Sequence, residues 1–371
     1  MDPALQRTLE LLLIVGIGLL LQKRLAGRQQ LEGIKLIILN VALPATIFLA
    51  LLKVELKPGL LLLPGLALAF NLAMFLAVRY ALPLFAPRHG APQRRTLALM
   101  LPSLAPGLSC YPFIMAYMDE SSLALAALAD VGNKFFGLIL LYLLAMHWYH
   151  QGGRPTDRKA PVAKKLRGLF LSLVREPINL VIGTAIILLI AGLNLESLPG
   201  FIAAAINRFS VMMVALVLLF IGMAVRVSLS DLRTIALLLS WRSGLALLFS
   251  SLMLLLLPAL TPALALLVIV FPQSSCSFWP YAHMHLVSER EKAETRTQPT
   301  FDNGFAVNLL ACSLPFSSGM ILLLFNFSET LAHTWVLATA GLTLVALSLL
   351  PRIWQVALRK LRSAIPENVM P

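Results

Sequence analysis

The chain carries two proline-rich stretches, PSLAPGLSCYPF at residues 102–113 and PQSSCSFWPY at residues 272–281. Each lies within a hydrophobic segment, one in each half of the chain. Proline lacks a backbone N–H and its ring clashes with the preceding helical turn, so a helix that holds several prolines must open its hydrogen-bond ladder. Opened backbone is tolerated at membrane depth only where it is packed in protein or lines a water-filled cavity. Both stretches are therefore expected inside the protein rather than against lipid.

The composition indicates an integral membrane protein. Hydrophobic residues make up 59% of the 371 residues and charged residues 13%, and the mean hydropathy is +0.85. Ordinary globular domains carry about 25% charged residues. In a soluble chain the net charge of +13 would suggest nucleic acid as a partner. Most basic residues here lie in short loops between apolar segments, where they set membrane orientation, so we expect no nucleic-acid partner.

Eleven apolar segments are long enough to cross a membrane. They lie roughly at residues 5–22, 34–52, 58–80, 96–118, 121–147, 177–194, 201–225, 234–258, 262–286, 301–326 and 333–351. The two proline-rich stretches fall in the fourth and the ninth of these segments. Interruptions at matching places in two halves of a chain are typical of transporters, in which they mark a substrate site near the middle of the bilayer.

The basic residues indicate how these segments are oriented. With the N-terminus outside, 23 of the 30 lysines and arginines fall in inside loops or in the C-terminal tail. Lys53 and Lys57 are among the few left outside, and this bias favours an outside N-terminus and a cytoplasmic C-terminus. Asp2 and Glu10 are atypical of the basic start of a secretory signal, so no cleavable signal is expected. We expect an integral protein of the bacterial inner (cytoplasmic) membrane.

A basic stretch at residues 150–176 is a predicted cytoplasmic linker. The units around it are a first five-helix repeat, a second five-helix repeat, and an extra span with a basic cytoplasmic tail, at residues 1–149, 177–327 and 328–371. An odd number of spans in each half inverts the second half relative to the first. We predict an all-α integral membrane protein of two inverted five-helix repeats, with crossed, broken fourth and ninth helices and one extra C-terminal span.

Short echoes between the halves favour this repeat. The fifth and tenth spans share Asp-x-Gly, as Asp130-Val-Gly132 and Asp302-Asn-Gly304. A weaker echo links residues 53–57 with residues 226–230, and both pairs occur in the same order in the two halves. Internal similarity in a constant order is the sequence signature of a structural repeat.

Neither the cysteines nor the histidines form a recognisable metal site. Cys110, Cys276 and Cys312 all fall within predicted spans, and their odd count argues against a disulfide framework. His283 and His285 are two residues apart, so they do not share a helix face. The sequence holds no glycine-rich phosphate loop, nucleophile elbow or zinc-protease motif. We expect no enzymatic activity, no bound metal and no cofactor.

Four segments together resemble one transporter family. They are, in chain order, Gly33–Phe48 with its Leu-Pro-Ala run, Ser121–Asp130, Arg175–Ile178 and Leu219–Met223. Through about residue 326 the chain is similar in these segments to the auxin efflux carrier family, and more distantly to the sodium/bile acid symporter superfamily. The resemblance implies ten spans in two inverted repeats, with crossed broken helices in the fourth and ninth. It further implies transport of organic anions, such as dicarboxylates or auxin-like weak acids.

The chain also departs from that family's pattern. Val211 stands where many members have proline, residues 288–298 are unusually charged, and the last span at about 333–351 is extra. These differences mark a divergent branch. Substrate identity varies inside the family and is therefore not carried over.

The candidate substrate-binding residues lie in the second span and in the two proline-rich stretches. They are Asn40, Ser109, Cys110, Tyr111, Pro112, Gln273, Ser274, Ser275, Ser277 and Pro280. Polar groups beside opened backbone can donate hydrogen bonds, and half-helix N-termini carry a partial positive charge that suits a carboxylate. The simpler interpretations are that the prolines are kinks, that Asn40 braces its own helix, and that Tyr111 packs the crossing. The matched pair of stretches favours a binding site.

Asp130, Asn133 and Lys134 form the most informative polar cluster. They lie in the fifth span, and charges buried in a membrane are costly and usually face protein or water. Asp130 and Lys134 are one helical turn apart and can pair. One interpretation is a structural ion pair; the other makes Asp130 a proton or sodium site and lets Lys134 attract an anion. Asp302 and Asn303 are the counterparts in the second half, although Asp302 also stands where a helix is expected to begin.

Together these features predict a secondary transporter that moves a small organic anion by elevator-like alternating access. Spans three to five and eight to ten are expected to move, and the resemblance to the sodium/bile acid symporter architecture implies a scaffold of spans one, two, six and seven. The architecture also allows a homodimer through the scaffold spans, surrounded by membrane lipid. Two alternatives stay open: a sodium-coupled carrier of sterol-like or bicarbonate-like anions, and a channel or sensor on the same fold.

The predicted orientation can be tested by labelling. A cysteine placed in the 150–176 linker should be shielded from an impermeant thiol reagent in intact cells, and a cysteine placed near Lys53 should be labelled. The parent for this test should carry serine at its three cysteines. Labelling in the opposite sense would remove the basis for the inverted repeat.

Overall fold

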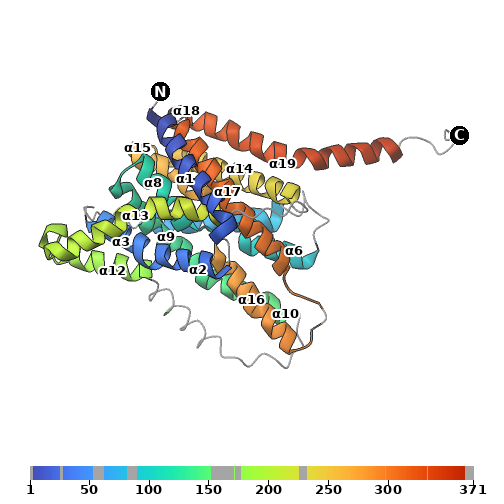
Figure 1. Ribbon diagram of the computed structural model, residues 1–371. Coiled ribbons are helices and arrows are strands. Elements are labelled where there is room, and N and C mark those ends of the chain that lie inside the picture. Colours follow the sequence, from blue (N-terminus) through green and yellow to red (C-terminus); the bar gives the residue numbers. More distant parts are fainter. Residues whose placement is uncertain are drawn as a thin grey trace.

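The computed structural model is all-helical in the residues that it describes (Figure 1). These are residues 3–25, 28–52, 62–81, 90–151, 171, 177–224, 232–296, 298–331 and 333–363. Seven stretches among them are long and apolar enough to cross a membrane: Gln29–Leu52, Leu62–Ala81, Glu120–Gln151, Gly200–Met223, Leu232–Leu256, Pro262–Ala293 and Asn303–Asn326. Of these, Pro262–Ala293 is interrupted by the non-helical residues 274–277. The predicted all-α class is confirmed, and these stretches fit an integral membrane protein.

The first half of the chain contributes nine helices to the described residues. They are α1 Pro3–Leu25, α2 Arg28–Ile37, α3 Leu43–Leu52, α4 Leu62–Leu76, α6 Ala91–Met100, α7 Pro106–Ser109, α8 Tyr111–Tyr117, α9 Glu120–Phe135 and α10 Leu141–Gln151. Single π-helical turns follow α2, α4 and α9, at Ile38–Ala42, Ala77–Ala81 and Phe136–Leu140. The first and third of these turns lead directly into α3 and α10.

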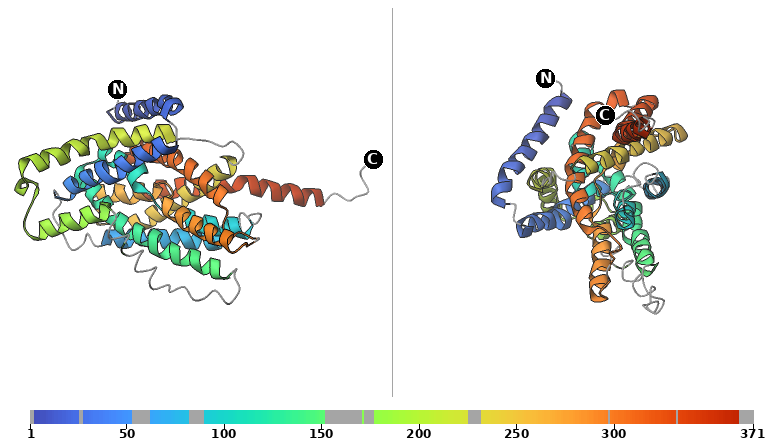
Figure 2. Two further views of the ribbon diagram at one scale, coloured as in Figure 1. Left: turned by 60° about the horizontal axis from the view of Figure 1, so that its bottom comes forward. Right: turned by 90° about the vertical axis from the view of Figure 1, so that its right-hand side faces the viewer.

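The second half contributes eight helices to the described residues. They are α12 Pro177–Ile190, α13 Gly200–Ala224, α14 Leu232–Leu256, α15 Pro262–Val270, α16 Phe278–Ala293, α17 Asn303–Asn326, α18 Ser328–Leu331 and α19 Thr334–Ser363. Short 3₁₀ turns lie at Leu195–Ser197 and Phe271–Gln273. The far end of α19 projects away from the bundle (Figures 1 and 2).

Four of the eleven expected spans differ from the seven long stretches. The expected span 96–118 is interrupted, because α6, α7 and α8 share it. The expected span 177–194 contains only the 14-residue α12, and the expected span 333–351 is the first part of α19. The expected span 5–22 lies within α1, at the edge of the bundle (Figure 2). Most of the predicted linker 150–176, and the echo at 53–57 and 226–230, lie outside the described residues, so the inverted repeat stays a prediction.

Side-chain caps place several helix starts. Asp119 precedes α9, and its Oδ1 accepts a hydrogen bond from the Ser122 backbone N–H at 2.7 Å. Hydrogen bonds from the side chain and the backbone of Ser122 lower the pKa of the Asp119 carboxyl. Thr261 and Asp302 cap α15 and α17 in the same way. Such residues satisfy amides that have no partner within the helix, so these helix starts are encoded locally.

Glycines allow the closest helix contacts. On α14 and α19, a Cβ atom added at Gly244 would lie 2.7 Å from the Gly341 carbonyl oxygen. On α1 and α13, a Cβ atom at Gly222 would lie 2.9 Å from the Gly18 carbonyl carbon. Small residues that let backbones approach are a usual means of packing helices in membranes. The extra helix α19 is thereby attached to α14.

Contacts divide most of the long helices into two groups. The first group comprises α1, α2, α3, α12 and α13, in which α13 packs against α1 and α3, and α12 packs against α3. The second group comprises α4, α9, α10, α14, α15, α16, α17 and α19, with α4 against α9, α10 against α16, and α14 against α17 and α19. Contacts of α9 with α3 and α12, and of α17 with α1 and α13, join the two groups, and α8 contacts α1 and α13 of the first group as well as α9 and α17 of the second.

The ends of α10 and α16 are fastened to one another. Arg296 donates from Nη1 to the Tyr149 carbonyl at 2.9 Å, and its guanidinium carbon lies 4.2 Å from the Tyr149 ring centroid. The Tyr149 hydroxyl donates to Glu294, and this hydrogen bond lowers the pKa of the Glu294 carboxyl. A guanidinium over an aromatic face is attractive. The two helices of the second group are thus held together at this end.

Candidate functional site

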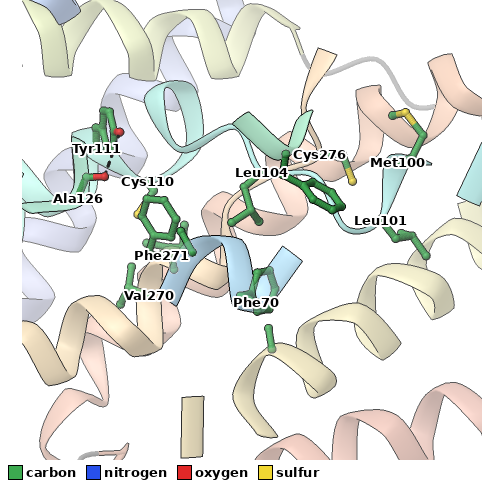
Figure 3. Packing of buried hydrophobic residues seen from close by; sticks show 14 of the residues in the cluster. Phe70, Met100, Leu101, Leu104, Cys110, Tyr111, Ala126, Val270, Phe271 and Cys276 are labelled. Atoms are coloured by element: carbon green, nitrogen blue, oxygen red, sulfur yellow. Dashed lines mark hydrogen bonds between the residues drawn. The ribbon is translucent and has the colours of Figure 1, made fainter. Parts of the chain in front are cut away.

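Two non-helical segments meet in the interior of the bundle. The first junction, residues 101–105, separates α6 from α7, and the second junction, residues 274–277, separates the 3₁₀ turn from α16. Both lie in the proline-rich stretches. Figure 3 shows Leu104 and Cys276, one from each junction, among the buried core residues.

The two junctions bond directly to each other. The Ala105 N–H donates to the Ser275 carbonyl at 2.8 Å, and the Ser277 N–H donates to the Ser103 hydroxyl at 3.1 Å. The Ser275 N–H donates to the Ser109 hydroxyl at 2.9 Å. Backbone groups that a continuous helix would satisfy internally find partners here across a sequence separation of more than 160 residues.

Arg242 on α14 binds carbonyl oxygens of both junctions. Its Nε donates to Leu101 O at 2.8 Å, and its Nη2 donates to Ser103 O at 3.3 Å and to Ser274 O at 2.8 Å. The side chain is buried, with 2% of its surface exposed. Leu101 and Ser274 cap the C-terminal ends of α6 and of the 3₁₀ turn, where partial negative charge gathers. The guanidinium therefore neutralises two helix ends and satisfies three carbonyls.

Asn133 on α9 completes the bonding of the first junction. Its Oδ1 accepts from the Leu104 N–H at 3.1 Å and its Nδ2 donates to the Leu104 carbonyl at 3.0 Å. The same Oδ1 accepts from Asn71 Nδ2 at 2.9 Å, and the same Nδ2 donates to Asp130 Oδ1 at 2.7 Å. One amide thus replaces the helical partners of Leu104 and holds Asp130 beside the junction.

Asp130 and Lys134 form a buried ion pair. Lys134 Nζ lies 3.5 Å from Asp130 Oδ2, and the two residues are 7% and 3% exposed. The pairing expected from their spacing is therefore confirmed. The other carboxylate oxygen of Asp130, Oδ1, accepts a hydrogen bond from Asn133 Nδ2. Charges that are taken out of water need such partners, because their desolvation is costly.

A cavity of about 640 Å³ opens beside the junctions and this ion pair. Its polar lining residues include Lys35, Asp130, Asn133, Lys134, Ser275, Cys276, Ser277 and Tyr281. Apolar and aromatic side chains make up most of the rest, among them Phe220, Phe278 and Trp279. Ligand pockets are commonly of this size and composition, with a few polar groups in a mainly apolar wall.

The structure brings five of the predicted site residues to this cavity. They are Asp130, Asn133, Lys134, Ser275 and Ser277. Ser277 also caps α16, since its Oγ accepts from the Trp279 N–H at 3.3 Å. The N-terminus of a 16-residue helix therefore begins at the cavity.

Other predicted residues of the proline-rich stretches support the junctions from behind. Cys110 and Tyr111 are fully buried, and the Tyr111 hydroxyl points to the Ala126 carbonyl (Figure 3). Gln273 exchanges hydrogen bonds with Ser243 on α14. The Ser274 hydroxyl donates to the Phe271 carbonyl at 2.7 Å. These contacts favour packing and bracing over substrate contact.

The two prolines of the predicted site begin helices. Pro112 is the second residue of α8 and Pro280 is the third residue of α16. Proline is well accepted in a first helical turn, because the N–H that it lacks has no partner within the helix there. Both prolines therefore allow a new helix to start directly after a junction.

Three predicted residues lie away from the cavity wall. Asn40 is exposed, and its Nδ2 donates to the Leu36 carbonyl of its own helix at 2.9 Å. Asp302 is the N-cap of α17, with its Oδ1 accepting from the Phe305 N–H, and Asn303 is the first residue of that helix. The hydrogen bond of Asn40 fits the alternative in which this residue braces its own helix, and its contact with substrate stays a prediction.

Sequence reasoning missed four residues that shape the site. Arg242 and Ser103 bond to backbone groups of the junctions, Asn71 donates to the Asn133 side chain, and Lys35 lines the cavity. Arg242 carried a signal, because an arginine in the middle of an apolar span usually has a function. No sequence signal distinguishes Ser103, Asn71 and Lys35 from other polar residues in or near the spans.

A comparison with protein-family models and with curated proteins gives no match. The function is therefore argued from the cavity and its chemistry.

Removal of the Arg242 side chain should destabilise the protein. Arg242→Met would leave three buried carbonyls without their donor, and each unsatisfied group costs about 1–3 kcal/mol. We expect a loss of roughly 3 kcal/mol or more, seen as a lower midpoint of thermal unfolding in detergent. The stability of Arg242→Lys should lie between those of the wild type and Arg242→Met, since one ammonium cannot bond to both junctions.

The matched control for this substitution is Arg208→Met, because Arg208 is exposed on α13. It should unfold at the wild-type temperature. An Arg242→Met protein as stable as the control would contradict the role given to Arg242.

Proposed function

We propose that this protein is a secondary transporter that moves a small organic anion across the membrane by elevator-like alternating access. The observation that carries the proposal is the cavity at the two junctions, which lies between the two groups of helices. Lys35, Leu39, Ile178 and Phe220 line it from the first group, and the other lining residues come from junctions and helices outside that group. A site between two bodies is one that their relative motion can open and close.

The charges of the cavity favour an anion. Lys35 and Lys134 both line it, whereas Asp130 supplies a single carboxylate that lies against Lys134. The N-terminus of α16 adds partial positive charge at the same wall. Hydroxyl groups of Ser275 and Ser277 provide neutral hydrogen-bonding partners. A carboxylate fits this combination, and the apolar wall suits the remainder of a small organic molecule.

Helix packing supports two bodies of the expected kind. The first group contains α1, α2, α3, α12 and α13, which correspond to the spans expected to form a scaffold. The second group is internally fastened, by Arg242 at the junctions and by Arg296 at the ends of α10 and α16. We assign the moving core to this second group, with α19 carried on α14 through Gly244 and Gly341.

The proposal extends to family and location. The segments around Leu43-Pro44-Ala45 and Asp130 resemble the auxin efflux carrier family, and the site geometry is compatible with a divergent member in a bacterial inner membrane. Protons or sodium ions are the proposed coupling ions, with Asp130 as their site. The buried carboxylate at the cavity wall supports that choice, because a group at such a place can bind a cation when water reaches it.

Reconstituted uptake tests the proposed function. Purified protein in liposomes should take up members of a carboxylate panel with saturation and with stimulation of exchange by substrate on the opposite side. Imposed proton or sodium gradients should raise the uptake of the transported member. Currents without saturation or exchange would indicate a channel, and failure of the whole panel would contradict anion transport.

Asp130 can be tested separately as the coupling site. Asp130→Asn keeps the size of the side chain and an oxygen that can accept from Asn133, so the protein should fold. Its uptake should stop responding to the ion gradient, while exchange of substrate persists. A structural ion pair predicts instead a stability loss of about 3–5 kcal/mol, because Lys134 would be left buried without its partner.

The double variant Asp130→Asn with Lys134→Met separates the two roles. It removes both charges of the pair. Recovery of gradient-driven uptake in this variant would contradict coupling by Asp130. A stable single variant that exchanges substrate but ignores the gradient would agree with it.

A further inference from the structure

Lys35 makes a contact that joins the two groups of helices across the cavity. It belongs to α2, in the first group, and its Nζ lies 4.7 Å from the ring centroid of Phe278. Phe278 is the first residue of α16, in the second group, and follows the second junction directly. Both side chains line the cavity. An ammonium over an aromatic face at this distance is held by the quadrupole of the ring.

Lys35 lines the cavity and has one acidic neighbour on its own helix. Lys35 is half-buried, and Glu32, which is exposed and one turn away, interacts with its charge. The cavity carboxylate, Asp130, lies against Lys134 and binds Asn133. An anion that enters the cavity therefore meets an ammonium whose partner within the cavity is a neutral ring.

A carboxylate is the stronger partner for that ammonium. Charge-assisted hydrogen bonds are among the strongest polar contacts in proteins, whereas a cation over a half-exposed ring is attracted weakly. Phe278 is 48% exposed, so the protein does not enclose this ring. Binding of an anion and retention of the Lys35–Phe278 contact compete for one ammonium.

We propose that the Lys35–Phe278 contact is a latch between scaffold and core that the transported anion opens. The inference rests on the proposed function, since it assumes two bodies that slide. With the latch closed, α16 is held to α2 and the core is restrained. An anion that draws Lys35 away from the ring removes this restraint. Movement of the core is thereby coupled to binding of the anion. When the cavity is empty, the closed latch limits that movement.

A double-mutant cycle tests the latch. The dissociation constants of radiolabelled benzoate and succinate would be measured by equilibrium dialysis on the purified full-length protein. Phe278→Leu should tighten binding by about two- to five-fold, because the anion no longer displaces the ring. Lys35→Gln should weaken binding by about ten-fold or more, through loss of a charged partner. In the Lys35→Gln background, Phe278→Leu should then change nothing.

Three controls separate the latch from packing. Phe327→Leu makes the same change at an exposed phenylalanine of the α17 C-terminus and should leave binding unchanged. Binding of the neutral probe benzamide should not depend on Lys35. Phe278→Trp offers a stronger cation–π face and should weaken anion binding, which keeps the test valid if Lys35→Gln does not fold.

Equal effects of Phe278→Leu in both Lys35 backgrounds would overturn the latch, as would weaker binding of the anions by Phe278→Leu or tighter binding by Phe278→Trp. If wild-type protein binds the carboxylates while the cycle is additive, the latch alone fails. If wild-type protein neither binds nor takes up any carboxylate, anion transport and the latch fail together.

Discussion

The interior of this bundle depends on the hydrogen bonding of backbone that is not helical. Residues of the two junctions are buried in a protein whose long helices are apolar enough to span a membrane. Unpaired N–H and C=O groups are costly there, because hydrocarbon supplies no partner. Arg242 and Asn133 satisfy carbonyls and an amide of the junctions, and the two junctions satisfy each other. Because of this network, the two junctions can remain non-helical while their backbone groups keep hydrogen-bond partners.

The cavity follows from that arrangement. Because the junctions end helices in the middle of the bundle, the start of α16 faces open space. The two kinds of helix end have different partners. Arg242 donates to carbonyls at the C-terminal ends of α6 and the 3₁₀ turn, whereas the N-terminal end of α16 lies at the cavity. A helix N-terminus supplies partial positive charge without a charged side chain, which agrees with the mainly apolar wall of the cavity.

Several properties of the site could be anticipated from sequence and others could not. The Asp130–Lys134 pair follows from a spacing of one turn within one helix, and the prolines point to the stretches that hold the junctions. Asn40 is exposed and donates to the Leu36 carbonyl of its own helix, which agrees with the simpler interpretation that it braces that helix. The partners of the junctions on distant helices come from α9, α14 and α17. No local pattern relates those helices to the junctions.

The sequence by itself determined the all-helical class, the apolar segments and the places where prolines open them, because hydropathy and proline chemistry act over a few neighbouring residues. Only the tertiary structure decided that Arg242 reaches Leu101, 141 residues earlier in the chain, or that Lys35 lies over Phe278. Which polar residues face a cavity is set by the rotation and contact of whole helices. In apolar spans that rotation depends on close backbone approach at a few glycines and on buried polar partners, and those pairs form only when the bundle is assembled.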